Sequence, residues 1–146
     1  MKTLIGVATT SLSEDEKSLL QHGMVAGVVL LARNCPSLSA MASLIDEIKA
    51  LKPSVMICLD HEGGQVQRIH DPRLNLPSSF SWDCASSELR AQRAALQEAW
   101  RKPMKLLKDS GVDMLLGPCV DIQGLLQSED KIIDYEKNLY YYKSMN

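Results

Sequence analysis

A ten-residue stretch, LDHEGGQVQR at 59–68, combines charged side chains with a pair of glycines. Asp60 closes an apolar run, and Arg68 follows it after a turn that Gly63 and Gly64 make sterically easy. A carboxylate and a guanidinium fixed on one rim accept from and donate to neighbouring hydroxyl groups, so this pair suits a polyhydroxylated ligand. The residues alone leave open an alternative, in which Asp60 caps a helix or pairs with Arg68 and binds nothing.

Other common kinds of site find little support in the chain. Residues 63–64 are not part of a G-x-G-x-x-G motif, and no P-loop motif occurs elsewhere, which argues against nucleotide binding. The four cysteines have neither C-x-x-C spacing nor a histidine at ligand spacing, so we expect reduced structural thiols and no metal site. They are Cys35, Cys58, Cys84 and Cys119. None of the histidines His22, His61 and His70 is expected to be catalytic, and His22 is expected at the surface near a helix end.

Length and charge restrict the class of protein. The 146 residues suffice for one domain, and a net charge of −2 with a pI of about 5.9 argues against nucleic-acid binding and against electrostatic attachment to a membrane surface. The longest apolar runs are far shorter than the roughly 20 residues that a membrane-spanning helix needs. The N-terminal residues lack the long apolar core of a secretory signal, so we expect a cytoplasmic protein.

Helical patterns occupy the segments between the apolar runs. Residues 13–16 (SEDE) form a capping box that predicts the start of the first helix, and the second is expected to begin at Ser37 or Ser39. A third pattern spans about 87–110, where Pro103 predicts a kink or break. Its apolar face is expected to comprise Leu89, Leu96, Trp100, Met104 and Leu107.

Four apolar runs have strand length, and polar residues follow them. They are expected at 4–8, 25–31, 55–59 and 112–120. Alternation of such strands with helices predicts a parallel α/β sheet, either a small doubly wound sheet or the opening half of a (β/α)₈ barrel. In both folds, functional side chains gather at the carboxyl ends of the strands, and here these ends carry residues 33–34, residues 60–68 and Asp121. A flavodoxin-like regulatory module would need an acidic cluster after the first strand, where Ala8-Thr9-Thr10 stands instead.

The run Asp60-x-Glu62-Gly63-Gly64-x-Val66-x-Arg68 resembles the N-terminal signature of glycoside hydrolase family 3. The resemblance is greatest to the bacterial cytoplasmic β-N-acetylglucosaminidases of the family, which act in peptidoglycan recycling. It extends over about residues 4–122 and includes residues 25–34, the Leu76-Pro77 turn and residues 117–122.

The resemblance implies a fold, a reaction and a ligand. The fold is a (β/α)₈ TIM barrel, of which the chain would form strands 1–4 with their helices. The reaction is retaining hydrolysis of terminal β-linked N-acetylglucosamine, without metal or cofactor, and the partner is a saccharide that contains this sugar. Asp60 and Arg68 match positions that bind hydroxyl groups of the non-reducing sugar, and Asp121 matches a further position at the end of strand 4.

The chain also departs from the family. A complete barrel takes about 250 residues, and neither the Lys-His-Phe-Pro-Gly-His-Gly segment before the acid/base histidine nor the Ser-Asp-Asp around the nucleophile is found here. We therefore expect a truncated barrel domain over 1–122 without catalytic residues, followed at 123–146 by a divergent tyrosine-rich tail outside the barrel. Two hypotheses follow: a glycosidase that is inactive alone, or a non-catalytic remnant that binds sugar or self-associates through the exposed edges of its half barrel.

Overall fold

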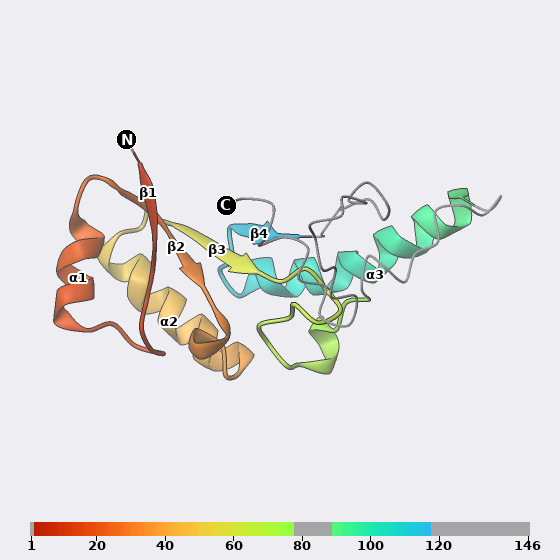
Figure 1. Ribbon diagram of the computed structural model, residues 1–146, viewed down its shortest axis with the longest axis horizontal. Coiled ribbons are helices and arrows are strands. Elements are labelled where there is room, and N and C mark those ends of the chain that lie inside the picture. Colours follow the sequence, from red (N-terminus) through yellow and green to blue (C-terminus); the bar gives the residue numbers. More distant parts are fainter. Residues whose placement is uncertain (1, 78–88, 118–146) are drawn as a thin grey trace, which may run out of the picture.

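A computed structural model describes residues 2–77 and 89–117, which form a parallel sheet with helices (Figure 1). The four strands are β1 (Thr3–Gly6), β2 (Val25–Leu30), β3 (Met56–Asp60) and β4 (Met114–Leu116). The helices are α1 (Glu14–Gln21), α2 (Leu38–Leu51) and α3 (Leu89–Asp109), with short 3-10 helices η1 (Ala32–Asn34) and η2 (Pro72–Leu74). All four expected strands and three expected helices are present. Residues 118–120 of the fourth expected strand lie outside the described residues.

Strand order decides between the two architectures that the sequence left open. The strands lie in the order β1-β2-β3-β4, and each neighbouring pair is parallel. A doubly wound sheet reverses its strand order at a switch point and carries helices on both faces. Here the sheet is wound in one direction, which is the arrangement of consecutive units of a (β/α)₈ barrel.

The hydrophobic core lies on one face of the sheet. Side chains at alternate strand positions, Val28 and Leu30 of β2 and Ile57 and Leu59 of β3, are completely buried. They belong to one cluster with apolar residues of α1, α2 and α3. The described helices therefore cover the same face, with α1 and α2 towards the β1 end of the sheet and α3 extending past β4 (Figure 1).

The opposite face of the sheet carries exposed apolar side chains, which we call the open face. It comprises Leu4 (45% exposed), Met56 (36%), Met114 (42%) and Leu116 (39%). Leu4, Gly27 and Met56 are aligned across β1, β2 and β3. A Cβ atom on Gly27 would come within 2.6 Å of Leu4 Cδ2 and 2.7 Å of the Met56 carbonyl oxygen, so glycine is what allows these neighbours to approach.

The helix starts follow the predicted capping. The Ser13 hydroxyl accepts from the Glu16 amide at 3.2 Å, and a Glu16 carboxylate oxygen accepts from the Ser13 amide at 2.8 Å, which confirms the capping box. Of the two candidate starts of α2, Ser37 is correct, because its hydroxyl accepts from the Ala40 amide at 3.1 Å. The last helix ends before Gly111, whose φ of +95° suits glycine.

Of the kink or break expected at Pro103, the break is wrong and the kink stays a prediction. Helix α3 continues from Leu89 to Asp109 with the proline inside it. Pro103 is buried in line with Trp100 and Leu107, and this packing compensates for the backbone hydrogen bond that proline cannot donate. The expected apolar face is accordingly wrong at Met104, which is 49% exposed, because Pro103 occupies the buried position. The side chains of Leu89 and Leu96 lie outside the described residues.

Within residues 2–77 and 89–117, no helix combines the length and apolar character needed to cross a membrane.

Candidate functional site

Asp60 and Arg68 meet at the carboxyl end of the sheet. Asp60 is the last residue of β3, and its Oδ2 forms an ion pair with Nη2 of Arg68. The Asp60 and Arg68 side chains retain 13% and 25% of their exposure, so both remain open to solvent at one side. Helix capping by Asp60, one of the predicted structural roles, is wrong because residues 61–71 contain no helix. Pairing of Asp60 with Arg68, the other predicted role, is confirmed.

A tight turn returns the chain from Asp60 to Arg68. The Glu62 amide donates to the Val66 carbonyl at 2.8 Å, and Gly63 forms an antiparallel bridge with Val66. Gly63 and Gly64 have φ angles of +92° and +61°, a region that L side chains rarely adopt. A Cβ on Gly63 would come within 2.5 Å of the Pro77 carbonyl oxygen. The turn therefore requires both glycines, and the segment packed against it requires glycine at position 63.

Two further side chains of the signature hold this loop in place. His61 is completely buried, its Nε2 lies 3.0 Å from the Leu74 carbonyl oxygen, and its Nδ1 accepts from the Arg68 amide at 3.2 Å. Gln67 donates from Nε2 to the Gly64 carbonyl at 2.8 Å and accepts at Oε1 from the Leu76 amide at 2.8 Å. The loop that carries Arg68 is thus fastened to residues 74–76.

Sequence reasoning assigned no role to His61 or Gln67. A signal for His61 was present, because the residues on one side of an extended strand recur every second position. His61 continues the buried series of Ile57 and Leu59, while Asp60 lies on the other side. Gln67 gave no such signal, because its partners depend on how residues 74–76 fold back. His22 is exposed, as expected, and His70 is also exposed.

The end of β4 lies against the start of the loop. The His61 amide donates to the Leu116 carbonyl at 3.2 Å. A Cβ on Gly117 would come within 2.9 Å of the His61 carbonyl oxygen and the Glu62 Cα, so glycine permits this close approach. Asp121, the third expected ligand residue, lies outside the described residues.

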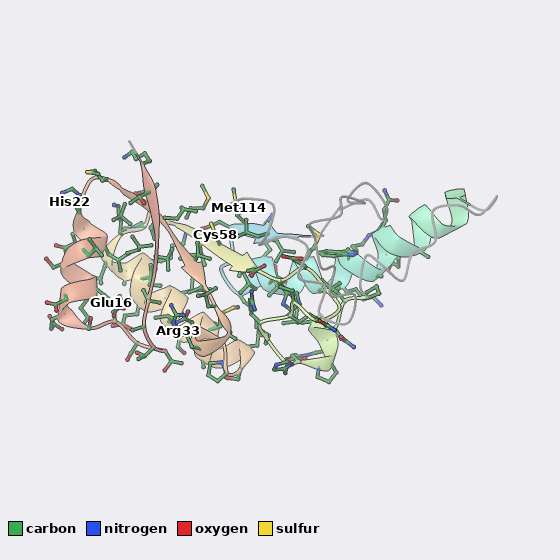
Figure 2. All side chains as sticks on the ribbon, viewed as in Figure 1. Glu16, His22, Arg33, Cys58 and Met114 are labelled. Atoms are coloured by element: carbon green, nitrogen blue, oxygen red, sulfur yellow. The ribbon has the colours of Figure 1, made fainter. Side chains whose placement is uncertain are left out.

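The polar pair at the end of β2 has a structural function. Asn34 is completely buried: its Nδ2 donates to the Val7 and Thr9 carbonyls at 3.1 and 2.7 Å, and its Oδ1 accepts from the Leu31 amide at 3.0 Å. Nε of Arg33, labelled in Figure 2, donates to the same Val7 carbonyl at 3.0 Å. These bonds tie the exit of β1 to the exit of β2.

The described cysteines are buried free thiols, as expected for Cys35 and Cys58. Burial raises the pKa of Cys35 to about 12, although the nearby Arg68 charge opposes this. Burial also raises the pKa of Cys58, which is aligned with Met114 on the neighbouring strand (Figure 2). Both thiols are therefore protonated near neutral pH. Cys84 and Cys119 lie outside the described residues.

Metal-ligating side chains do not gather in the described part of the chain: residues 2–77 and 89–117 contain no group of three or more His, Cys, Asp or Glu that could hold a metal ion. The polar groups that meet at the end of β3 are instead a carboxylate and a guanidinium. This pair can accept from and donate to hydroxyl groups of a bound ligand.

The parallel sheet and the signature loop at the end of β3 agree with a comparison of the sequence with known protein families. Residues 2–131 match the glycosyl hydrolase family 3 N terminal domain. The chain belongs to glycosyl hydrolase family 3.

Particular relatives extend this assignment. The chain is 43% identical over 122 residues to a beta-hexosaminidase of Xanthomonas oryzae pv. oryzae, a match that covers 82% of this chain and 36% of the relative. It is 34% identical over 111 residues to a beta-hexosaminidase of Methylococcus capsulatus, which covers 76% of this chain and 33% of the relative. The chain thus spans about a third of the length of the curated relatives that it matches.

Solved structures agree on the fold. NagZ from Neisseria gonorrhoeae, in complex with N-trifluoroacetyl-D-glucosamine, superposes with a TM-score of 0.67 at 31% identity, over 76% of this chain and 34% of NagZ. A family 3 β-N-acetylglucosaminidase from Paenibacillus sp. str. FPU-7 gives a TM-score of 0.67 at 23% identity, over 82% of this chain and 23% of that protein. The expected fold, the N-terminal part of a family 3 TIM-barrel-like domain, is confirmed.

Proposed function

We propose that this chain provides the sugar-binding part of a β-N-acetylhexosaminidase, an enzyme that hydrolyses terminal β-linked N-acetylglucosamine. The observation that carries the proposal is the Asp60–Arg68 ion pair, held partly exposed at the carboxyl end of β3 by the family signature. Relatives named beta-hexosaminidase, and a neighbouring structure with an N-acylated glucosamine, support the choice of sugar. The proposed setting, cytoplasmic peptidoglycan recycling, rests on the family resemblance.

In this proposal the two side chains hold adjacent hydroxyl groups of the terminal sugar. The Asp60 carboxylate accepts from one hydroxyl, and the Arg68 guanidinium donates to its neighbour. The ion pair orients both groups before the sugar arrives, which reduces the entropy lost on binding. Asp121 is proposed as a third contact, because it follows β4 and Leu116 of β4 is aligned with Asp60.

We further propose that the chain alone binds the sugar without hydrolysing it. Retaining hydrolysis requires a nucleophile and an acid/base group on the two sides of the scissile bond. The family segments that would supply them are not found in these 146 residues. Residues 1–122 are accordingly proposed as the barrel part and 123–146 as a tail outside it.

The test combines binding and turnover in one purified chain. Calorimetry would measure affinity for N-acetylglucosamine, and release of nitrophenol from its β-glycoside would measure hydrolysis. We expect binding that Asp60→Asn weakens by at least about tenfold, the loss of one charge-assisted hydrogen bond of roughly 1.5–3 kcal/mol. Asp46→Asn, which changes an exposed carboxylate of α2, is the matched control. Absence of binding, or equal effects of the two substitutions, would refute the sugar site. Turnover would refute the proposed inactivity.

A second proposal concerns the open face defined by Leu4, Met56, Met114 and Leu116. Exposed contiguous apolar side chains are typical of surfaces that bind a partner. We propose that two copies of the chain associate through this face and the adjoining sheet edges. The open face supports self-association because it brings together apolar side chains from β1, β3 and β4.

Sedimentation velocity would test self-association directly. The wild-type chain should sediment as a dimer, and Met56→Lys with Met114→Lys should produce a monomer, because burying two lysine charges in the interface is unfavourable. Met104→Lys is a matched control, since Met104 is similarly exposed but lies on α3. A monomeric wild type, or a double variant that remains a dimer, would overturn the proposal.

A further inference from the structure

The protonation state of His61 follows from its two hydrogen-bond partners. The Leu74 carbonyl only accepts, so Nε2, at 3.0 Å from it, carries a hydrogen. The Arg68 amide only donates, so Nδ1, at 3.2 Å, carries none. Both bonds form together only with the neutral imidazole that is protonated at Nε2.

This ring connects three parts of the site. His61 continues β3 beyond Asp60, Leu74 ends η2, and Arg68 supplies the guanidinium that pairs with Asp60. The His61 ring is completely buried, so water does not replace a broken bond without the loop moving. The backbone position of Arg68, and with it the reach of its side chain to Asp60, therefore depends on His61.

We propose that His61 is a positioning residue whose neutral ring holds Arg68 against Asp60, and that a proton gained at Nδ1 releases the loop and weakens sugar binding. Its consequence for the sugar rests on the proposed function. A protonated Nδ1 would point its hydrogen at the Arg68 amide hydrogen, which replaces an attraction with a repulsion.

The surroundings of the ring determine where this change occurs. Burial lowers the pKa of His61 and has the largest effect. The hydrogen bond to Leu74 and the Asp60 charge on β3 raise it, whereas the Arg68 and His70 charges on the loop lower it, and the net pKa is lowered. Above the unfolded pKa of about 6.5, His61 is therefore neutral and its full contribution to the stability of the loop is present. This contribution is lost as the pH falls through the lowered pKa of the folded chain.

Nuclear magnetic resonance of the full chain tests the positioning without any ligand. We expect the imidazole nitrogen signals of His61 to show the Nε2-protonated tautomer at pH 7, and the Arg68 amide to be protected from hydrogen exchange. That protection should disappear as His61 titrates. A Nδ1-protonated tautomer, or protection that does not follow the titration, would overturn the proposal.

Variants then connect the ring to the sugar. One pH unit below the pKa of His61, the neutral fraction is about one tenth, so affinity for N-acetylglucosamine should fall about tenfold. His61→Gln keeps a donor and an acceptor but does not titrate, so its affinity should stay constant. His70→Gln, an exposed control on the same segment, should keep the pH dependence, moved to a higher pH because the His70 charge no longer lowers the pKa of His61. The same pH dependence in His61→Gln would refute the role of His61. If no variant binds sugar at any pH while Arg68 protection follows His61, the proposed function fails and the positioning role stands.

Discussion

Replacement of Gly63 by alanine tests how closely the signature loop is packed. Gly63 has a φ of +92°, and an L residue in the left-handed region costs roughly 1–2 kcal/mol. The added Cβ would lie 2.5 Å from the Pro77 carbonyl oxygen and 3.2 Å from Leu76 Cβ. Because backbone must move to relieve this contact, overpacking adds about 1–3 kcal/mol. Gly63→Ala should therefore lower the free energy of unfolding by about 2–5 kcal/mol, out of the 5–15 kcal/mol typical of a domain.

Urea denaturation monitored by circular dichroism measures this loss, and a second glycine provides the control. Gly23 has open space around its would-be Cβ, with no atom within 4 Å. Gly23→Ala should therefore change the free energy of unfolding by no more than about 0.5 kcal/mol. If both alanine variants unfold at the same urea concentration as the wild type, the Pro77 carbonyl does not pack over Gly63 as described.

Three further predictions concern a buried side-chain amide, an ion-paired carboxylate and buried thiols. Asn34→Ala removes three hydrogen bonds of a buried side chain and should lower the free energy of unfolding by about 2–4 kcal/mol, measured by urea denaturation. A loss no larger than that caused by replacing an exposed residue would contradict this network. Burial raises the pKa of Asp113, but its hydrogen bonds to Lys49 and to a backbone amide outweigh this and lower the pKa below 3.8. Stability from Asp113 is thus present above that value and lost as the pH falls through the lowered pKa, and Asp113→Asn should flatten this part of an acid-unfolding curve. Iodoacetamide at pH 8 should leave Cys35 and Cys58 unmodified in the native chain and label both in urea, as mass spectrometry would show; rapid native labelling would contradict their burial.

The elements were predictable because local chemistry determines them. The capping box at Ser13 and Glu16 needs only residues three apart, and the alternation of apolar runs with amphipathic helices indicated a parallel sheet. The placement of Asp60 at a strand end was predictable for the same reason. The absence of a break at Pro103 is also physical, because burial of the helix face that contains Trp100, Pro103 and Leu107 overrides the local preference of proline.

The interior of the candidate site was less predictable. The signature indicated Asp60 and Arg68, but the hydrogen bonds of His61 and Gln67 reach residues 74–76, whose fold-back no periodicity reports. Arg33 and Asn34 show the reverse case. Their position at a strand end predicted a place at the site, whereas their side chains join β1 to β2.

The sequential strand order has a consequence for how the sheet assembles. Every strand pairs with the strand that precedes it in the chain, β1 with β2, β2 with β3 and β3 with β4. The β1–β2 and β2–β3 pairings therefore close short connections with one α-helix each, which keeps the entropic cost of these two steps low, whereas the β3–β4 connection is longer. During synthesis, β2 and β3 each find a partner edge already made, so the sheet can grow in the order of translation. The Asp60–Arg68 pair is made by residues that all precede β4 in the chain.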